Sequence, residues 1–175
     1  MLQRRLHRRD VLRAARILWL LVWTCPLMSN AQSQPHAVEI VRDFNASPEK
    51  VWRAWTEPAW VSRWFGSNAG GRVLDARLDV RPGGHFAVTF VDADGAEHTC
   101  SGDYIDVQPF DKLSFTWHWK SEPGVETLVT VAFRPEGTGT RMVFEHSRLF
   151  VASAHDYSSG WRGTFDKLAR VLGED

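Results

Sequence analysis

Residues 47–66 read SPEKVWRAWTEPAWVSRWFG, a run that places four tryptophans within thirteen positions. Such large rings are costly to leave in water, so a small domain hides them in a core or around a hollow. Ser47 suits the N-cap of a helix and Pro48 its first position, which predicts a helix to about Thr56. Pro58 then begins a second short helix. The run therefore predicts two short helices with buried tryptophans.

On both sides of this run, apolar and polar residues alternate as they do in half-buried strands. One strand is expected before the helices, at residues 38–44, and six after them, joined by short turns. In the first of these six, Leu74, Ala76, Leu78 and Val80 are expected on the inner face. Short turns between successive strands indicate a meandering antiparallel sheet.

A long helix is expected from about Ser153 to Leu172. Its apolar stripe has the spacing of an amphipathic helix and consists of Trp161, Phe165, Leu168 and Leu172. Only this helix is available to cover the wide apolar face of the sheet, so the sheet is expected to curl around it. Gly160 and Gly163 remove side chains where the helix approaches the sheet or a guest molecule. The predicted fold class is α+β, a curved seven-stranded antiparallel sheet wrapped around the C-terminal helix, with a hollow between them.

Composition excludes several classes of protein. Hydrophobic residues at 43% and charged residues at 24% are typical of a globular protein and exclude disorder. The formal net charge is zero, but residues 1–31 hold six arginines and a single acid. The rest of the chain has 15 basic and 20 acidic residues, a net charge of −5, with no basic run. Nucleic-acid binding, which needs clustered Lys and Arg, is therefore not expected.

Residues 1–31 are expected to be a leader outside the fold, and residues 36–173 a single domain. A basic region followed by a short apolar stretch and Ser29-Asn-Ala31 has the layout of a secretory signal. The apolar stretch is too short for a stable membrane span. The alternative is a true start at Met28, which would leave a short polar tail before the first strand. An internal start, which we favour, predicts a cytoplasmic protein, and a cleaved signal predicts an exported, periplasmic one.

The order of segments is similar to that of a known superfamily. The opening 44–65, the hairpin 79–86, the strand 109–117, and the segments 139–146 and 159–168 resemble the SRPBCC (START and birch-allergen-like) superfamily. Within it, the chain looks like homologues of the C-terminal domain of the heat-shock-protein-90 ATPase activator. The resemblance covers about residues 38–172. It implies a helix-grip fold of the kind already expected.

A hollow lined by aromatic rings with a few polar groups is the usual form of a small-molecule site. Trp52 and Trp55 are assigned to the core, whereas Trp64 and Phe65 are expected at the mouth of the pocket. The predicted ligand-binding set consists of Trp64, Phe86, Tyr104, Trp117, Phe133, Phe144, His146 and Trp161.

Candidate groups for chemistry are few. No histidine has the spacing of a metal ligand, and His98 and Cys100 form only a pair, so no metal and no cofactor are expected. His146 is in phase with Phe144 and should point inward, where a hydrogen-bonded structural role is expected rather than a catalytic one. Cys100 is expected to be an inert strand residue. Asp92 belongs to a turn without calcium-loop spacing.

Three functions follow from these residues. The first is non-catalytic binding of a small hydrophobic molecule or lipid between the sheet and the C-terminal helix. The second is an enzyme of the cyclase or dehydratase kind that uses an inward His146 or tyrosine; a strongly shifted pKa of His146 would favour it. The third is a protein-interaction module with a chaperone partner, as the resemblance implies; a large exposed apolar patch would favour it.

Overall fold

The computed structural model describes residues 36–149 and 155–173, which belong to one compact unit, 33–175. The leader expected over residues 1–31 lies outside the described residues. Among the helices described, none has the length and apolar character needed to cross a membrane.

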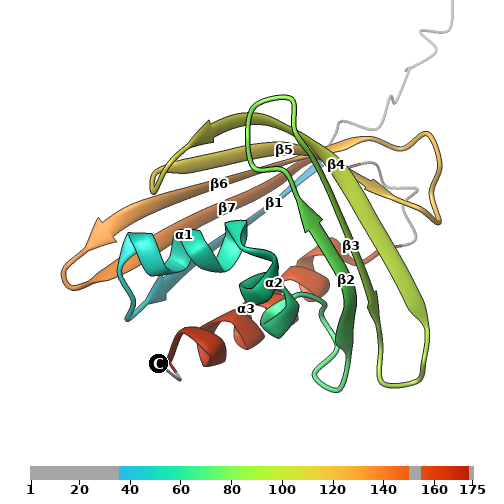
Figure 1. The fold of residues 1–175 in the computed structure, drawn as a ribbon, viewed down its shortest axis with the longest axis horizontal. Coiled ribbons are helices and arrows are strands. Elements are labelled where there is room, and N and C mark those ends of the chain that lie inside the picture. Colours follow the sequence, from blue (N-terminus) through green and yellow to red (C-terminus); the bar gives the residue numbers. More distant parts are fainter. Residues whose placement is uncertain (1–35, 150–154, 174–175) are drawn as a thin grey trace, which may run out of the picture. The chain divides into compact units, whose positions relative to one another are not determined.

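Seven antiparallel strands form a single sheet in the order β1-β7-β6-β5-β4-β3-β2. Each strand from β2 to β6 pairs with the next along the chain, and β1 lies at one edge of the sheet, paired with β7. Figure 1 shows the sheet curving over the helices, which lie on its concave side. The strands are β1 (His36–Phe44), β2 (Arg72–Leu78), β3 (His85–Val91), β4 (Glu97–Gln108), β5 (Lys112–Trp119), β6 (Thr127–Glu136) and β7 (Gly139–Leu149). The predicted α+β fold with a seven-stranded curved sheet is confirmed.

Irregularities in the pairing help to bend the sheet. The register shifts in β1 between His36 and Val38, in β2 between Val73 and Asp75, and in β4 between Tyr104 and Asp106. Such bulges increase local twist and curvature.

The shift in β2 also corrects one prediction. Leu74, expected on the inner face, is 48% exposed, because the extra residue reverses the phase of the side chains at that point. Val73 packs against the core in its place, and Ala76 and Leu78 keep their predicted inward positions.

The tryptophan-rich run forms two helices, as predicted, α1 (Pro48–Thr56) and α2 (Pro58–Trp64). The Ser47 hydroxyl caps α1 by accepting a hydrogen bond from the backbone N–H of Lys50 at 3.3 Å. Trp52 and Trp55 are buried, which confirms their assignment to the core.

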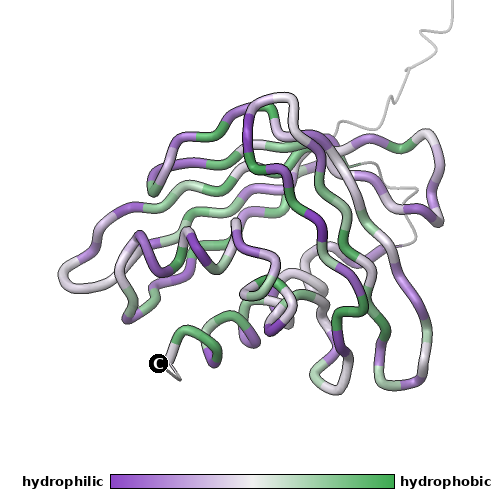
Figure 2. Tube along the Cα trace, viewed as in Figure 1, coloured by the Kyte–Doolittle hydropathy of each residue, from purple (hydrophilic) through white to green (hydrophobic). Residues whose placement is uncertain are grey.

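The third helix, α3 (Tyr157–Gly173), begins later than the predicted Ser153. Asp156 caps it, because its carboxylate accepts a hydrogen bond from the N–H of Ser159 at 3.0 Å. The predicted stripe from Trp161 to Leu172 is buried along its whole length. Figure 2 shows hydrophobic and hydrophilic residues alternating along the strands, and burial alternates in the same way in β3 and β6.

Candidate functional site

A pocket of about 670 Å³ opens between the concave face of the sheet and the first half of α3. This volume lies within the usual range of small-molecule sites, roughly 300–1,000 Å³. Three parts of the described chain line it: the segment after α2, the ends of β3, β4 and β5, and the start of α3. The lining residues are Phe65, Gly66, Ser67, Asn68, Phe90, Asp92, His98, Trp117, Trp119, His155, Asp156, Tyr157, Ser159, Gly160, Trp161, Arg162, Gly163 and Thr164.

Aromatic rings that support one another form the walls of the pocket. Phe65 stacks on Trp117 with ring centroids 6.1 Å apart, and Trp117 meets Trp161 edge to face at 5.1 Å. Trp119 stacks on His155 at 4.4 Å. Because each ring is held by a neighbour from another element, the walls are preorganised and present flat apolar faces.

One side of the pocket is polar. Asp92 and His98 stand at the adjoining ends of β3 and β4, and the His98 Nε2 lies 3.1 Å from the Asp92 Oδ2. Their side chains are 25% and 31% exposed, so both groups are partly withdrawn from water. His98 also packs beside the ring of Phe90, its cross-strand partner. The pair holds the imidazole of His98 in one orientation at the edge of the aromatic walls.

Three polar atoms of the lining residues have no hydrogen-bond partner within the described chain. They are the Asp92 Oδ1 and the indole nitrogens of Trp117 and Trp119, all buried. Buried polar groups are nearly always paired, so unpaired groups around a cavity need an explanation. These unpaired groups belong to residues that line the pocket, but the atoms themselves have almost no contact with solvent.

Lys167 attaches the segment after α2 to α3. Its ammonium lies 3.4 Å from the carbonyl oxygens of both Phe65 and Asn68. Burial lowers the pKa of Lys167, while the charge of Asp92 acts in the opposite direction. The contact fixes one rim of the pocket against the helix.

The two glycines of α3 have different surroundings. A Cβ added to Gly163 would come within 2.8 Å of the Ser67 carbonyl oxygen, so this glycine permits the close approach of α3 to the pocket rim. A Cβ added to Gly160 would meet no atom within 4 Å. Gly160 therefore leaves open space in the lining of the pocket.

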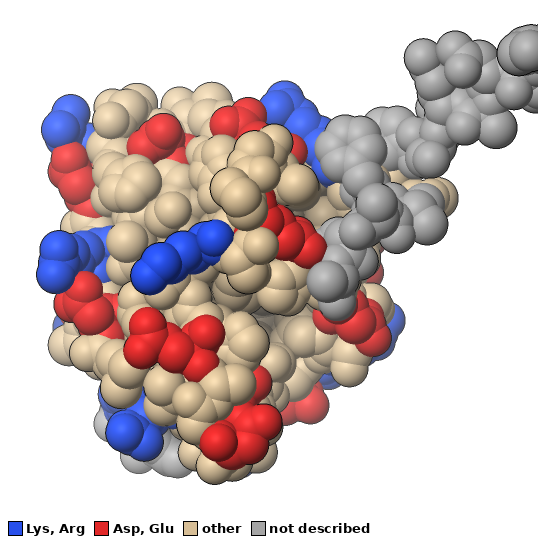
Figure 3. Space-filling view, turned by 90° about the vertical axis from the view of Figure 1, so that its right-hand side faces the viewer, with Lys and Arg blue, Asp and Glu red and all other residues tan. Residues whose placement is uncertain are grey.

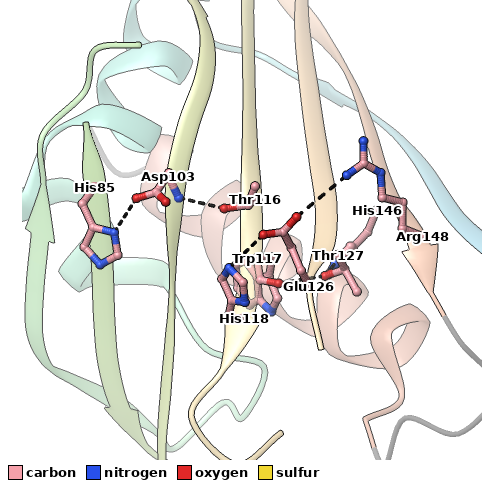
Figure 4. A network of polar contacts seen from close by, with 9 residues as sticks. All are labelled: His85, Asp103, Thr116, Trp117, His118, Glu126, Thr127, His146 and Arg148. Carbon is pink, nitrogen blue, oxygen red and sulfur yellow. Dashed lines mark hydrogen bonds and ion pairs between the residues drawn. The ribbon is translucent and has the colours of Figure 1, made fainter. Parts of the chain in front are cut away.

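His146 is fully buried and does not line the pocket, and both its ring nitrogens are hydrogen-bonded. Figure 4 shows it beside Thr127. The indole N–H of Trp161 donates to the His146 Nδ1 at 2.9 Å. Since an indole nitrogen can only donate, Nδ1 carries no proton and Nε2 does. Nε2 then donates to the Thr127 hydroxyl at 2.7 Å, which in turn donates to the Trp117 carbonyl oxygen at 3.2 Å. The relay joins β5, β6, β7 and α3.

Burial lowers the pKa of His146 from 6.5 to about 3. A strongly shifted pKa of an inward His146 is the observation that was expected to favour the enzyme hypothesis. However, its cause is desolvation of a neutral ring whose two nitrogens already have partners, and His146 does not line the pocket. The geometry therefore favours the structural role.

The residues predicted to bind the ligand fall into three groups. Trp117 and Trp161 line the pocket. Trp64, Phe86 and Tyr104 surround a separate void of about 20 Å³, with room for one water molecule at most. Three further residues of the set, Phe133, Phe144 and His146, are no more than 1% exposed and fill the core.

Trp64 also differs from its expected place at the pocket mouth. It is 1% exposed, and its indole N–H donates to the Ala54 carbonyl oxygen at 2.8 Å, which joins α2 to α1. Phe65, expected beside it, does line the pocket. Adjacent residues at the end of a helix point in different directions, so only one of Trp64 and Phe65 can face the pocket.

Sequence reasoning did not assign Asp92 and His98 to the site. The available signal was the continuation of the strand period beyond the strand, from Phe86, Val88 and Phe90 to Asp92. The same period runs backward along β4 from Cys100 to His98. This period places both residues on the concave face. Because Asp92 was assigned to a turn, its side chain was not predicted to line the pocket.

No group of three or more His, Cys, Asp or Glu side chains that could hold a metal ion is found in residues 36–149 and 155–173.

Cys100 is fully buried, and burial raises the pKa of its thiol, so it is inert as expected. On the face shown in Figure 3, basic and acidic side chains are interspersed rather than gathered into a patch of one sign.

The family described as "Activator of Hsp90 ATPase homolog 1-like protein" matches residues 45–173, which include all three helices and six of the seven strands. The chain belongs to this family. The match confirms the resemblance seen in the sequence. No curated protein matches the sequence.

Several solved structures share the fold. A Chromobacterium violaceum protein is 21% identical, with a TM-score of 0.70 over 79% of this chain and 98% of its own. A Rhizobium leguminosarum protein is 29% identical, with a TM-score of 0.69 over 81% of this chain and 97% of its own. The AHSA1-like protein of Aeromonas hydrophila is 24% identical, with a TM-score of 0.68 over 79% and 92%. These likenesses support the helix-grip architecture.

Proposed function

We propose that this activator-like protein binds a small, mainly apolar molecule, without transforming it, in the pocket between the sheet and α3. The observation that carries the proposal is the 670 Å³ pocket itself, walled by Phe65, Trp117, Trp119 and Trp161. Apolar surface that a guest buries there is removed from water, which favours binding by roughly 25 cal/mol per Å² before the costs of association. His146, the candidate acid–base group of the alternative enzyme hypothesis, has both ring nitrogens hydrogen-bonded and does not line the pocket.

A glycine on the pocket wall allows the proposal to be tested without disturbing the core. Leu at position 160 would project into open space, because a Cβ there meets no atom within 4 Å. Replacing a helical glycine also favours the helix by roughly 0.5–1 kcal/mol. The Gly160→Leu protein is therefore expected to fold at least as stably as the original and to have a smaller pocket.

The measurement is a fluorescence titration with the neutral apolar dye N-phenyl-1-naphthylamine. We expect saturable binding to the original protein and at least a tenfold loss of affinity in Gly160→Leu. The matched control is Gly173→Leu, the same exchange at the exposed end of α3, where a Cβ also meets no atom within 4 Å. The control should bind the dye like the original protein.

The proposal fails if the original protein does not bind the dye, or if Gly160→Leu binds it as well as Gly173→Leu does. Native mass spectrometry of the freshly purified protein adds an independent test. A co-purifying molecule that is present in Gly173→Leu and absent from Gly160→Leu would support the pocket as its site.

A chaperone-directed interaction, which the family description raises, has weaker support from the described surface. Five large hydrophobic side chains are exposed there: Val41, Leu74, Ile105, Phe110 and Val143. Of these, Val41 and Val143 are cross-strand partners, and the other three lie on β2, on β4 and in the turn between β4 and β5. This scatter is ordinary for a monomer surface and does not form the contiguous patch of a docking site.

For the compartment, we propose translation from Met28 and a cytoplasmic protein. The intact mass of the protein purified from its natural host tests this. An intact mass equal to that of a chain starting at Met28 or Ser29 supports the proposal. A product cleaved after Ala31 would show export instead.

A further inference from the structure

The described part of the chain holds two comparable His–Asp pairs on neighbouring strands. His85 and Asp103 lie on the outer face of β3 and β4, with Nδ1 and Oδ1 2.8 Å apart and both side chains more than 60% exposed (Figure 4). His98 and Asp92 lie at the other end of the same two strands and line the pocket. Their side chains are at most 31% exposed. Because the side chains of Asp92 and His98 are less exposed to water, this pair carries a desolvation cost that the exposed His85–Asp103 pair avoids.

The turn between β3 and β4 does not need the carboxylate of Asp92. Backbone hydrogen bonds close the turn, from Gly95 N–H to the Asp92 carbonyl and from Asp92 N–H to the Ala96 carbonyl. The side chain that supports it is that of Asp94, which accepts from the Ala96 N–H at 3.0 Å. The carboxylate of Asp92 is therefore placed in the pocket lining without a hydrogen bond to the turn.

The carboxylate of Asp92 has an unused capacity to accept a hydrogen bond. Its Oδ2 is bonded to His98, whereas its Oδ1 has no partner among the described residues. A carboxylate oxygen can accept more than one hydrogen bond, so Oδ2 can accept one from a ligand while it keeps the bond to His98. What the pair lacks is a donor, and a ligand hydroxyl is the simplest group that supplies one.

The charges around the pair disfavour an anionic ligand. The pocket lining includes Asp92 and Asp156 as acids and Arg162 as its fixed cation, and Lys167 lies behind the rim, bonded to backbone carbonyls. A carboxylate placed against Asp92 would meet a like charge in a partly desolvated site. A neutral hydroxyl meets an acceptor there instead.

We propose that the Asp92–His98 pair is the specificity-determining group of the pocket, and that it selects flat aromatic molecules with a hydroxyl, phenols, over carboxylic acids and plain hydrocarbons. This inference rests on the proposed binding function. The flat faces of Phe65, Trp117 and Trp119 match the ring of such a ligand, and the pair beside them matches its hydroxyl. Fatty acids and aromatic acids are excluded by the charge of Asp92.

The test compares three ligands of one shape, namely 2-naphthol, 2-methylnaphthalene and 2-naphthoate, by displacement of the neutral dye from the full-length protein. We expect 2-naphthol to bind at least tenfold more tightly than 2-naphthoate. In Asp92→Asn, which keeps the shape and removes the charge, we expect the affinity ratio of naphthol to naphthoate to fall about tenfold. The ratio of naphthol to methylnaphthalene should fall as well, because a neutral amide is a weaker acceptor.

Two matched controls separate the pair from general effects of charge. Asp94→Asn removes the same charge from the same turn, and His85→Gln disrupts the exposed His–Asp pair. Both ratios should stay as in the original protein in these controls, while His98→Gln, which removes the orienting imidazole, should lower the preference for naphthol.

The inference is overturned if the original protein prefers 2-naphthoate, or if Asp92→Asn leaves both ratios unchanged while dye and hydrocarbon still bind. In either case the pocket proposal stands. If neither the dye nor any of the three ligands binds, both the inference and the proposed function fail.

Discussion

The two hydrogen bonds of His146 determine which ring nitrogen carries the proton. Protonation of Nδ1 would break the bond from the Trp161 indole and place a charge in the core. The sequence predicted the inward direction of this residue from its phase with Phe144. It could not predict the bonds, because Trp161 and Thr127 lie on other elements and approach His146 only in the folded chain. The buried relay is thus a tertiary feature with no local signal.

His146 predicts a specific dependence of stability on pH. The folded state keeps the ring neutral down to about pH 3, whereas the unfolded chain binds a proton below its ordinary pKa of 6.5. The unfolded state therefore gains protons first as the pH falls, and stability is lost between pH 6.5 and 3, at a slope of about 1.4 kcal/mol per pH unit. In urea melts from pH 7 to 5, His146→Gln should lack this component of the slope. Equal slopes in both proteins would show that His146 is protonated in the fold.

Trp161 and His146 should behave as a coupled pair. Trp161→Phe leaves Nδ1 of His146 buried without a donor and should lower the free energy of unfolding by about 1–3 kcal/mol. His146→Leu orphans the indole N–H in the same way. The double variant removes both polar groups, so its loss should be smaller than the sum of the two single losses. Strict additivity in denaturant melts would contradict the bond.

At the scale of elements, α3 was the most predictable part of the chain and β2 the least. The stripe from Trp161 to Leu172 repeats for three turns, so its buried face followed directly from its period. The strand β2 contains a bulge, and a single extra residue turned Leu74 outward. Nothing in the local sequence marks that bulge, because Leu74 fits an inward position as well as Val73 does.

The two glycines of α3 give a matched pair of substitutions in one helix. Gly160→Ala should raise the free energy of unfolding by roughly 0.5–1 kcal/mol, because its Cβ meets open space and alanine favours the helix. Gly163→Ala should lower it by roughly 1–3 kcal/mol, because its Cβ would be forced against the Ser67 carbonyl oxygen. Thermal or urea melts measure both. A similar change in the two variants would mean that α3 does not approach the pocket rim as closely as described.

At the scale of the whole domain, the order of strands and helices was sufficient to predict the fold and the presence of a hollow. The position of the hollow could not be predicted from that order. It lies at the N-terminal half of α3, beside His98 of β4, Asp92 of the turn between β3 and β4, and Trp119 of β5. The rings of Phe133 and Phe144, expected to line it, pack into the core instead, because α1 brings Trp52 and Trp55 against them. Which rings fill the core and which remain at a wall depends on this packing between elements.

An NMR titration with the neutral dye that follows the indole N–H signals of the tryptophans tests directly whether there is a ligand pocket at the start of α3. We expect the signals of Trp117, Trp119 and Trp161 to shift together and saturate. Those of Trp55 and Trp64, which lie in the core, and of Trp60, which packs against Arg53 and Arg63, should stay in place or move far less. Shifts confined to Trp60, or saturating dye with no movement of Trp117 and Trp119, would contradict the claim.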